Sequence, residues 1–120
     1  MKLKVLPPTL RKNNRYLAID IKVNGDISKD DLVNIVWSGC IRFSGENKTG
    51  DFNLWVMRFY TLEKTSEYNH YQAILRAQRD HVGDVRAAIA LIYKYNGKNI
   101  SISTIGLSGT IKACQRFIDG

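Results

Sequence analysis

The sequence has few residues of the types that hold metal ions or cross-link a chain. Its 120 residues include two cysteines, two histidines and two prolines. A structural zinc site needs four Cys or His ligands at close spacing, and Cys40, Cys114, His70 and His81 are scattered along the chain. Both cysteines lie inside apolar helical patterns. We therefore expect two free buried thiols in a reducing compartment, and no metal site.

Long apolar runs are missing as well. No segment reaches the roughly 18 apolar residues that a membrane-spanning helix needs. The opening MKLKVLPPTLRKNN is basic but lacks the apolar stretch of a secretory signal. Hydrophobic residues make up 44% of the chain and charged residues 24%, a balance typical of a globular domain. We expect a cytoplasmic protein with no membrane contact, folded as a single domain over residues 15–120.

Acidic residues are the minority charge. Eleven Asp and Glu face 18 Lys and Arg, which gives a formal net charge of +7. Such an excess favours a polyanionic partner. The first 15 residues hold five cations, no acid and both prolines, which disfavour regular helix and central strand. We interpret residues 1–14 as an extended basic arm that contacts RNA. A charged tail without function is the alternative.

Apolar periodicity predicts an α+β fold. Alternation indicates strands over 15–23, 51–60, 71–78 and 99–107, joined by loops at 44–50 and 61–67 and by other turns. Helical spacing indicates one helix capped by Ser28 and a second from about Asp80, ending at Asn96-Gly97. A short helix follows Ser108-Gly109-Thr110. This order predicts a ferredoxin-like or RRM-like β-α-β-β-α-β sandwich, with a four-stranded antiparallel sheet, a basic N-terminal arm and a C-terminal helix.

Catalytic patterns are absent from the sequence. It contains no phosphate-binding Gly-rich loop and no Gly-x-Ser-x-Gly nucleophile motif. His81 stands beside Asp80 and Asp84, but acids at the start of a helix are better explained by capping and the helix dipole. The remaining carboxylates are too scattered for two-metal nuclease chemistry. We expect no catalytic residue in this chain.

Alternation places a mixture of aromatic and basic residues on the face of the sheet away from the two long helices. This second face is expected to carry Tyr16, Arg58, Tyr60 and Arg76, with apolar Val56 and Ile74 among them. Tyrosines can stack bases and arginines can hold phosphates. The apolar pair leaves the alternative that the final helix or a partner protein covers this face. The sequence signature of RNA-recognition domains is missing from the third strand.

The final helix offers a further pair of cations. Lys112 and Arg116 lie one turn apart, away from the apolar stripe of Ile111, Cys114 and Phe117. Arg42 and Lys48 are alternative phosphate contacts. The candidate RNA-binding residues are therefore Arg11, Lys12, Arg15, Arg58, Arg76, Lys112 and Arg116.

Two end motifs resemble one protein family. Leu6-Pro7-Pro8-Thr9-Leu10-Arg11, followed by Arg15-Tyr16, resembles the opening of archaeal ribonuclease P protein component 2. Ser108-Gly109-Thr110-Ile111-Lys112-Ala113-Cys114-Gln115-Arg116-Phe117 resembles the ending of that family and of its eukaryotic counterpart. The expected element order between the two motifs agrees with the resemblance, which therefore covers essentially the whole chain.

The resemblance implies a subunit of a tRNA-processing ribonucleoprotein. In such enzymes a large RNA holds Mg²⁺ and cleaves precursor tRNA endonucleolytically to remove the 5′ leader, while the protein supports the RNA and does no chemistry. The resemblance also implies pairing with component 3, a barrel-fold subunit, and joining of two such pairs through component 2 into a heterotetramer. It thus implies that this chain is a non-catalytic part of an enzyme.

Three other functions are compatible with parts of the pattern. A generic RRM-like module would bind single strands through an exposed Tyr16 and Tyr60. A ferredoxin-like protein-interaction or small-molecule-sensing domain would carry its charge incidentally. A stand-alone nuclease would require metal-dependent cleavage by the purified chain.

Overall fold

A computed structural model describes residues 14–65 and 67–118. Residues 1–13 lie outside the described residues, and with them all but the last residue of the expected basic arm, the motif Leu6–Arg11, and Lys12; Asn14, assigned to the arm, is the first residue of β1. In chain order the helices and strands are β1 (Asn14–Val23), α1 (Lys29–Ser44), α2 (Glu46–Gly50), β2 (Trp55–Lys64), β3 (Asn69–Gln78), α3 (Val82–Ala90), β4 (Lys94–Tyr95), β5 (Lys98–Ser108) and α4 (Ile111–Cys114). Short 3₁₀ turns over Arg79–His81 and Gln115–Phe117 precede α3 and follow α4.

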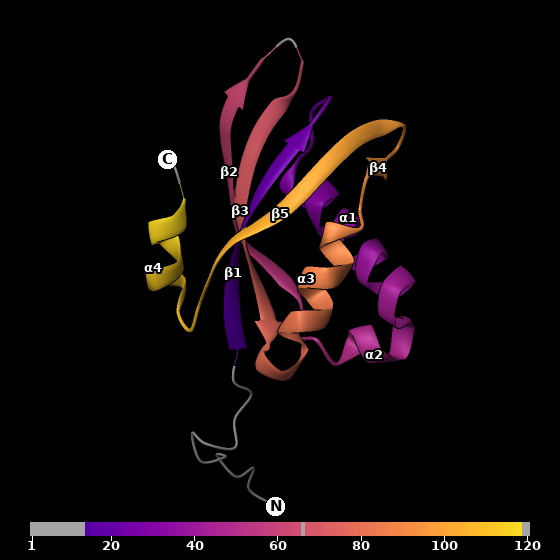
Figure 1. The fold of residues 1–120 in the computed structure, drawn as a ribbon, viewed down its shortest axis with the longest axis vertical. Helices are drawn as coiled ribbons and strands as arrows, with labels where there is room; N and C mark the ends of the chain where they lie inside the picture. The colour runs from indigo at the N-terminus through magenta and orange to yellow at the C-terminus, as the bar shows by residue number, and fades with distance from the viewer. Residues whose placement is uncertain (1–13, 66, 119–120) are drawn as a thin grey trace, which may run out of the picture.

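The strands form one antiparallel sheet in the order β2-β3-β1-β5-β4. Its four long strands have the spatial order of the predicted ferredoxin-like fold, with β1 and β3 central. The prediction of four strands is wrong, because the two-residue β4 adds a fifth strand at the β5 edge. Helices α1 and α3 cover one face of the sheet, and α4 lies against the other face (Figure 1).

Helix α1 begins where the sequence predicts. Ser28 Oγ accepts a hydrogen bond from Asp31 N at 3.1 Å, and Asp31 Oδ2 accepts one from Ser28 N at 2.9 Å. This reciprocal capping box satisfies two backbone donors that the first turn leaves without helical partners. The Ser28 backbone N–H also lowers the pKa of the Asp31 carboxyl. Ionised Asp31 therefore stabilises the helix start at neutral pH, and this contribution is lost as the pH falls through its lowered pKa.

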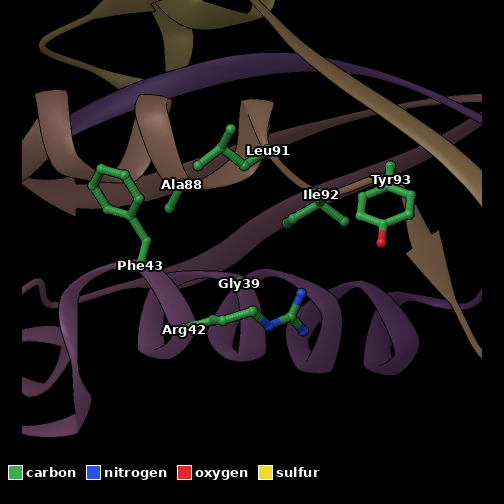
Figure 2. Close-up of a pocket in the computed structure, with 7 residues that line it drawn as sticks. All are labelled: Gly39, Arg42, Phe43, Ala88, Leu91, Ile92 and Tyr93. Atoms are coloured by element: carbon green, nitrogen blue, oxygen red, sulfur yellow. The ribbon is translucent and has the colours of Figure 1, made fainter.

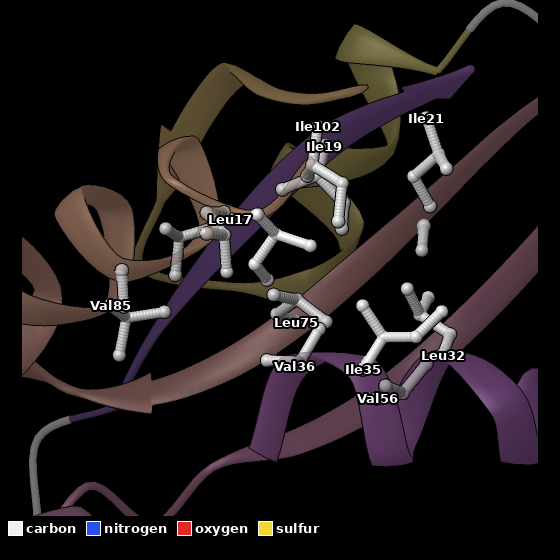
Figure 3. Packing of buried hydrophobic residues seen from close by; sticks show 14 of the residues in the cluster. Leu17, Ile19, Ile21, Leu32, Ile35, Val36, Val56, Leu75, Val85 and Ile102 are labelled. Atoms are coloured by element: carbon white, nitrogen blue, oxygen red, sulfur yellow. The ribbon is translucent and has the colours of Figure 1, made fainter. Parts of the chain in front are cut away.

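The main core lies between the sheet and the two long helices. Leu17, Ile19, Ile21 and Leu75 from the central strands meet Leu32, Ile35 and Val36 from α1 and Val85 from α3 (Figure 3). Gly39 lets α1 approach the segment after α3, because a Cβ there would lie 2.6 Å from Ile92 Cδ1. Burial of apolar surface at about 25 cal/mol per Å² makes this layer the dominant stabilising contact.

Two turns differ from the sequence prediction. Helix α3 ends at Ala90, and Asn96-Gly97, with φ of 49° and 79°, connects β4 to β5. Positive φ at both central residues is the geometry that two-residue hairpins prefer, so Asn-Gly serves the hairpin and not the helix exit. The expected loop over 44–50 contains the one-turn α2, which starts after Gly45.

Strand β2 is displaced and irregular relative to its prediction. It runs over Trp55–Lys64 instead of 51–60, and the hairpin loop to β3 is correspondingly short. Its pairing with β3 shifts between Val56 and Arg58. This bulge places both Val56 and Phe59 on the helix-covered face, so the assignment of Val56 to the second face is wrong.

The second face of the sheet is partly covered by α4. Ala18, Ile74 and Cys114 form a small buried cluster, against which Tyr16, Met57, Ile111 and Ile118 pack. The Cys114 Sγ–H donates to the Tyr16 carbonyl oxygen at 3.4 Å. Of the two alternatives for this face, the structure shows the one in which the final helix covers it. The second face is therefore not the fully open platform of a generic RRM-like module.

Gly106 permits α4 and the turn after it to seat on β5. A Cβ at Gly106 would overlap the ring of Phe117, whereas a Cβ at Gly109 would meet open space. We expect Gly106→Ala to displace the Phe117 ring and lower the free energy of unfolding by about 1–3 kcal/mol, the usual cost of overpacking. Thermal unfolding checks this, with Gly109→Ala as the matched control. Equal melting temperatures for the two variants would contradict the seating.

Both cysteines are buried and free, as predicted. Burial, with a smaller effect of the Asp84 charge, raises the pKa of Cys40 to about 12. Burial also raises the pKa of Cys114. Because the thiolate is the reactive form, neither residue is a nucleophile at neutral pH.

Candidate nucleic-acid interface

The candidate cations of the sheet lie on two different faces. Tyr16 pairs with Arg76 in the β1–β3 register, and Ile74 pairs with Arg58 in the β2–β3 register. Alternation therefore places Arg58 and Arg76 on the second face, as predicted. Arg15 pairs with Ala77, one residue out of phase, so it lies on the helix-covered side at the end of the sheet. Its Nη1 donates to the Asn14 carbonyl oxygen at 3.1 Å.

The Arg76 guanidinium is held in place by Asn53, a residue with an unusual backbone conformation. Its Nε donates to the Asn53 carbonyl oxygen at 3.0 Å, and its Nη2 donates to Asn53 Oδ1 at 3.2 Å. Asn53 adopts a positive φ of 53° and is itself tied to Asn14 Oδ1 through its Nδ2 at 2.8 Å. These bonds orient the guanidinium and use two of its five N–H donors, which leaves donors for an anion.

Trp55 is the aromatic residue of this face that the sequence reasoning missed. It begins β2 directly opposite Arg76, and 47% of its surface is exposed. The alternation predicted for β2 grouped Trp55 with Phe59, and the bulge that separates them is not visible in the sequence. An exposed indole beside Arg76 and Arg58 is a stacking platform next to two cations.

Two further cations come from α4, which packs on the same face of the sheet. Lys112 and Arg116 are exposed, while Cys114 on the same short helix is buried. The Arg116 Nε donates to the Ala113 carbonyl oxygen at 3.3 Å. Thr110 caps the helix by accepting from Ala113 N at 3.1 Å. We call Trp55, Arg58, Arg76, Lys112 and Arg116 the basic sheet surface.

The second face is more polar at the end of the β1–β3 pair away from Tyr16 and Arg76, which we call its upper part. Asp20 accepts a hydrogen bond from Gln72 Nε2 at 2.9 Å and contacts His70 Nε2. Lys22 Nζ lies 5.4 Å from the centre of the Tyr68 ring, and Tyr60 is half-buried nearby on the same face. Because Asp20 adds a negative charge here, the upper part attracts phosphate less than the basic sheet surface does.

Basic and acidic residues are unevenly distributed along the chain. The helix-layer segments 29–51 and 79–90 contain five basic and six acidic residues, while the rest of the sequence contains thirteen basic and five acidic residues. The entire positive excess is therefore outside the helix layer. A polyanion is therefore steered away from α1, α2 and α3 and toward the remaining segments of the chain.

The histidines are engaged in contacts of the fold. His81 packs against the Phe52 ring, with ring centroids 4.9 Å apart, and its Nδ1 lies 3.5 Å from Asp84 Oδ2. Asp84 also pairs with Lys48 Nζ at 3.6 Å. Within residues 14–65 and 67–118, no group of three or more His, Cys, Asp or Glu side chains is arranged to hold a metal ion. In the same part of the chain, no helix is long and apolar enough to span a membrane.

These features define a small α+β protein with ferredoxin-like strand order, one apolar helix layer and one basic side. Comparison with known proteins is more specific. The family model described as the Rpp14/Pop5 family matches residues 15–119. The chain belongs to the Rpp14/Pop5 family.

Named relatives match along almost the whole chain. A protein of Methanobrevibacter smithii named ribonuclease P protein component 2 is 79% identical over 99% of both chains. A protein of the same name from Pyrococcus horikoshii is 39% identical over 96% of this chain and 90% of the relative. A chain in the cryo-EM structure of yeast ribonuclease MRP has the same fold, with a TM-score of 0.53 and 11% identity over 83% of this chain and 76% of that one.

Proposed function

We propose that this chain is a protein subunit of ribonuclease P, the ribonucleoprotein that endonucleolytically removes the 5′ leader of precursor tRNA. The observation that carries the proposal is the full-length match, at 79% identity, to a protein named ribonuclease P protein component 2. The charge distribution supports it, because a basic side suits a protein that binds a large RNA.

The subunit supports the catalytic RNA and takes no part in bond breaking. In this proposal Mg²⁺ is bound by the RNA and supplies the charge stabilisation for cleavage. The protein neutralises repulsion between neighbouring phosphates through Arg58, Arg76, Lys112 and Arg116 on the sheet side. Arg15 at the sheet end, and Arg11 and Lys12 in the N-terminal segment, add contacts to the same RNA or to precursor tRNA.

The proposal includes the protein partners that the sequence resemblance implies. We propose that the chain pairs with the barrel-fold component 3, and that two such pairs join through this subunit into a heterotetramer that acts in the cytoplasm. The exposed apolar residues of the helix layer support a protein contact there, because soluble domains rarely leave such groups unused.

Reconstitution tests the proposed function. Ribonuclease P RNA and the other protein subunits are assayed on precursor tRNA with and without this chain, over a series of Mg²⁺ concentrations. We expect the chain to raise the cleavage rate most at low Mg²⁺, because protein cations then replace metal ions in neutralising phosphates. Equal rates with and without the chain at every Mg²⁺ concentration would refute the proposal, and cleavage by the isolated chain would refute its non-catalytic part.

A further inference from the structure

A polar hollow lies at one end of the sheet, where β1 ends, β5 begins and the β2–β3 hairpin turns back (Figure 1). It is lined by residues 22–24, 67–68 and 99–101. Its volume of about 330 Å³ is in the range of sites that hold small ligands. Lys22 has the same phase in β1 as Tyr16, so it stands on the second face of the sheet, together with the basic sheet surface.

Hydrogen bonds join the three segments that form the hollow. Asn24 N donates to the Asn99 carbonyl oxygen at 3.0 Å, and Asn99 N donates to Asn24 Oδ1 in return. Asn69 Nδ2 donates to the Gly25 carbonyl oxygen at 2.7 Å, which ties the hairpin to the turn after β1. The hollow is therefore formed before a ligand arrives, and binding pays little for ordering its walls.

Three side chains of the hollow are available to a ligand. Lys22 Nζ lies 5.4 Å from the centre of the half-buried Tyr68 ring, and Glu67 is exposed. Lys22 and Glu67 line one hollow with opposite charges, yet neither forms an ion pair with any residue that the structure describes. A matching ligand carries an anion for the ammonium, N–H donors for the carboxylate and a flat aromatic face for the ring. A nucleotide has all three.

The apolar groove between α1 and residues 91–93 has a different chemistry (Figure 2). Arg42 is the single charged residue among those that line it, and Phe43, Leu91 and Ile92 make most of its wall apolar. It has no carboxylate to accept the N–H donors of a base. The polar hollow is therefore the better match for a nucleotide.

We propose that the polar hollow binds one unpaired nucleotide of an RNA strand, with its base against Tyr68, the base edge on the Glu67 carboxylate and a phosphate at Lys22. Guanine fits best, because its N1–H and N2–H donors lie side by side and match the two carboxylate oxygens. The proposal rests on the function proposed above in its choice of RNA as the ligand.

The hollow adds sequence preference to a surface that otherwise binds phosphates. Phosphate contacts position a nucleic acid, whereas contacts to base edges specify its sequence. Lys22 lies six residues beyond Tyr16 in β1, a separation of about 20 Å at about 3.3 Å per residue. A single strand that crosses the second face from Trp55 to Tyr68 is thus held by its phosphates at one end and read by one base at the other.

Short oligonucleotides test this proposal on the purified full-length chain, with affinity measured by fluorescence anisotropy. The probe is an oligouridine of about ten nucleotides with one central guanosine. Two comparison strands carry adenosine or inosine, which lacks the N2 amino group, at that position. We expect the guanosine strand to bind about fivefold or more tightly than either comparison strand, the usual discrimination of a paired contact to a base edge.

Charge-matched variants locate the base edge. Glu67→Gln is expected to abolish the guanosine preference. Glu63→Gln removes the same charge from an exposed residue outside the hollow and is expected to keep the preference. Lys22→Met is expected to weaken binding of all three strands alike and to leave their order unchanged, because a phosphate contact carries no sequence information. All three residues are exposed, so we expect the variants to fold.

Two results would overturn the assignment. Equal affinity of the unaltered chain for the three strands would show that the hollow reads no base. A guanosine preference that survives Glu67→Gln would place the base edge elsewhere. Stimulation of precursor tRNA cleavage in the reconstituted particle reports on the proposed function separately, because it is expected whether or not the hollow reads a base.

Discussion

Replacing Lys112 and Arg116 together with alanine is expected to weaken binding of ribonuclease P RNA about tenfold or more at moderate salt. Each Lys or Arg that neutralises a phosphate releases counterions, so the loss of two contacts also makes the plot of log affinity against log salt shallower by about 2. Both side chains are exposed, and the residues that seat α4, such as Cys114, stay in place. Fluorescence anisotropy with labelled RNA over a salt series measures both quantities.

The control for this prediction removes the same charge from the other side of the molecule. Lys29 and Arg86 are exposed residues of the helix layer, and their double alanine variant has the same formal net charge as the α4 variant. We expect it to bind RNA nearly as well as the unaltered chain. If both variants lose affinity equally, net charge and not the basic sheet surface governs binding.

Trp55→Ala is expected to reduce affinity for single-stranded RNA between about fivefold and a hundredfold, because stacking of one base on an aromatic ring is worth about 1–3 kcal/mol. A duplex of the same length offers no free base and should bind with little change. Trp55→Phe keeps a smaller ring and should retain part of the affinity. Titration of both variants with a short single strand and with its duplex makes the comparison, and equal losses for the two RNAs would rule out stacking.

Much of the fold was predictable because local signals agree with the final packing. The alternation of Leu17, Ile19 and Ile21 identified β1, and Ser28 with Asp31 identified the start of α1. The misplaced features depend on tertiary context. The fifth strand is two residues long, too short for a pattern, and Asn96-Gly97 has left-handed geometry that suits a helix exit as well as a hairpin.

The candidate interface was predictable where strands are regular. Arg76 lies on the second face as predicted because β3 alternates without interruption, and Arg58 lies there because it follows the bulge in β2 and pairs with Ile74. Arg15 was grouped with them by charge, although its odd phase in β1 places it on the other side. Trp55 was missed because a bulge one residue later reverses the alternation of β2. The close approach of α1 to the segment after α3 was not predictable, because Gly39 and Ile92, which create it together, are far apart in the sequence.

Photocrosslinking tests most directly whether RNA binds the basic sheet surface and leaves the helix layer free. RNA crosslinked to the chain in the reconstituted particle is digested, and the modified peptides are located by mass spectrometry. We predict crosslinks in β2 around Trp55 and in the α4 segment over residues 110–117, with none in α1 or in residues 91–93, which follow α3. Crosslinks confined to α1 and residues 91–93, with β2 and α4 unmodified, would contradict RNA binding by the basic sheet surface.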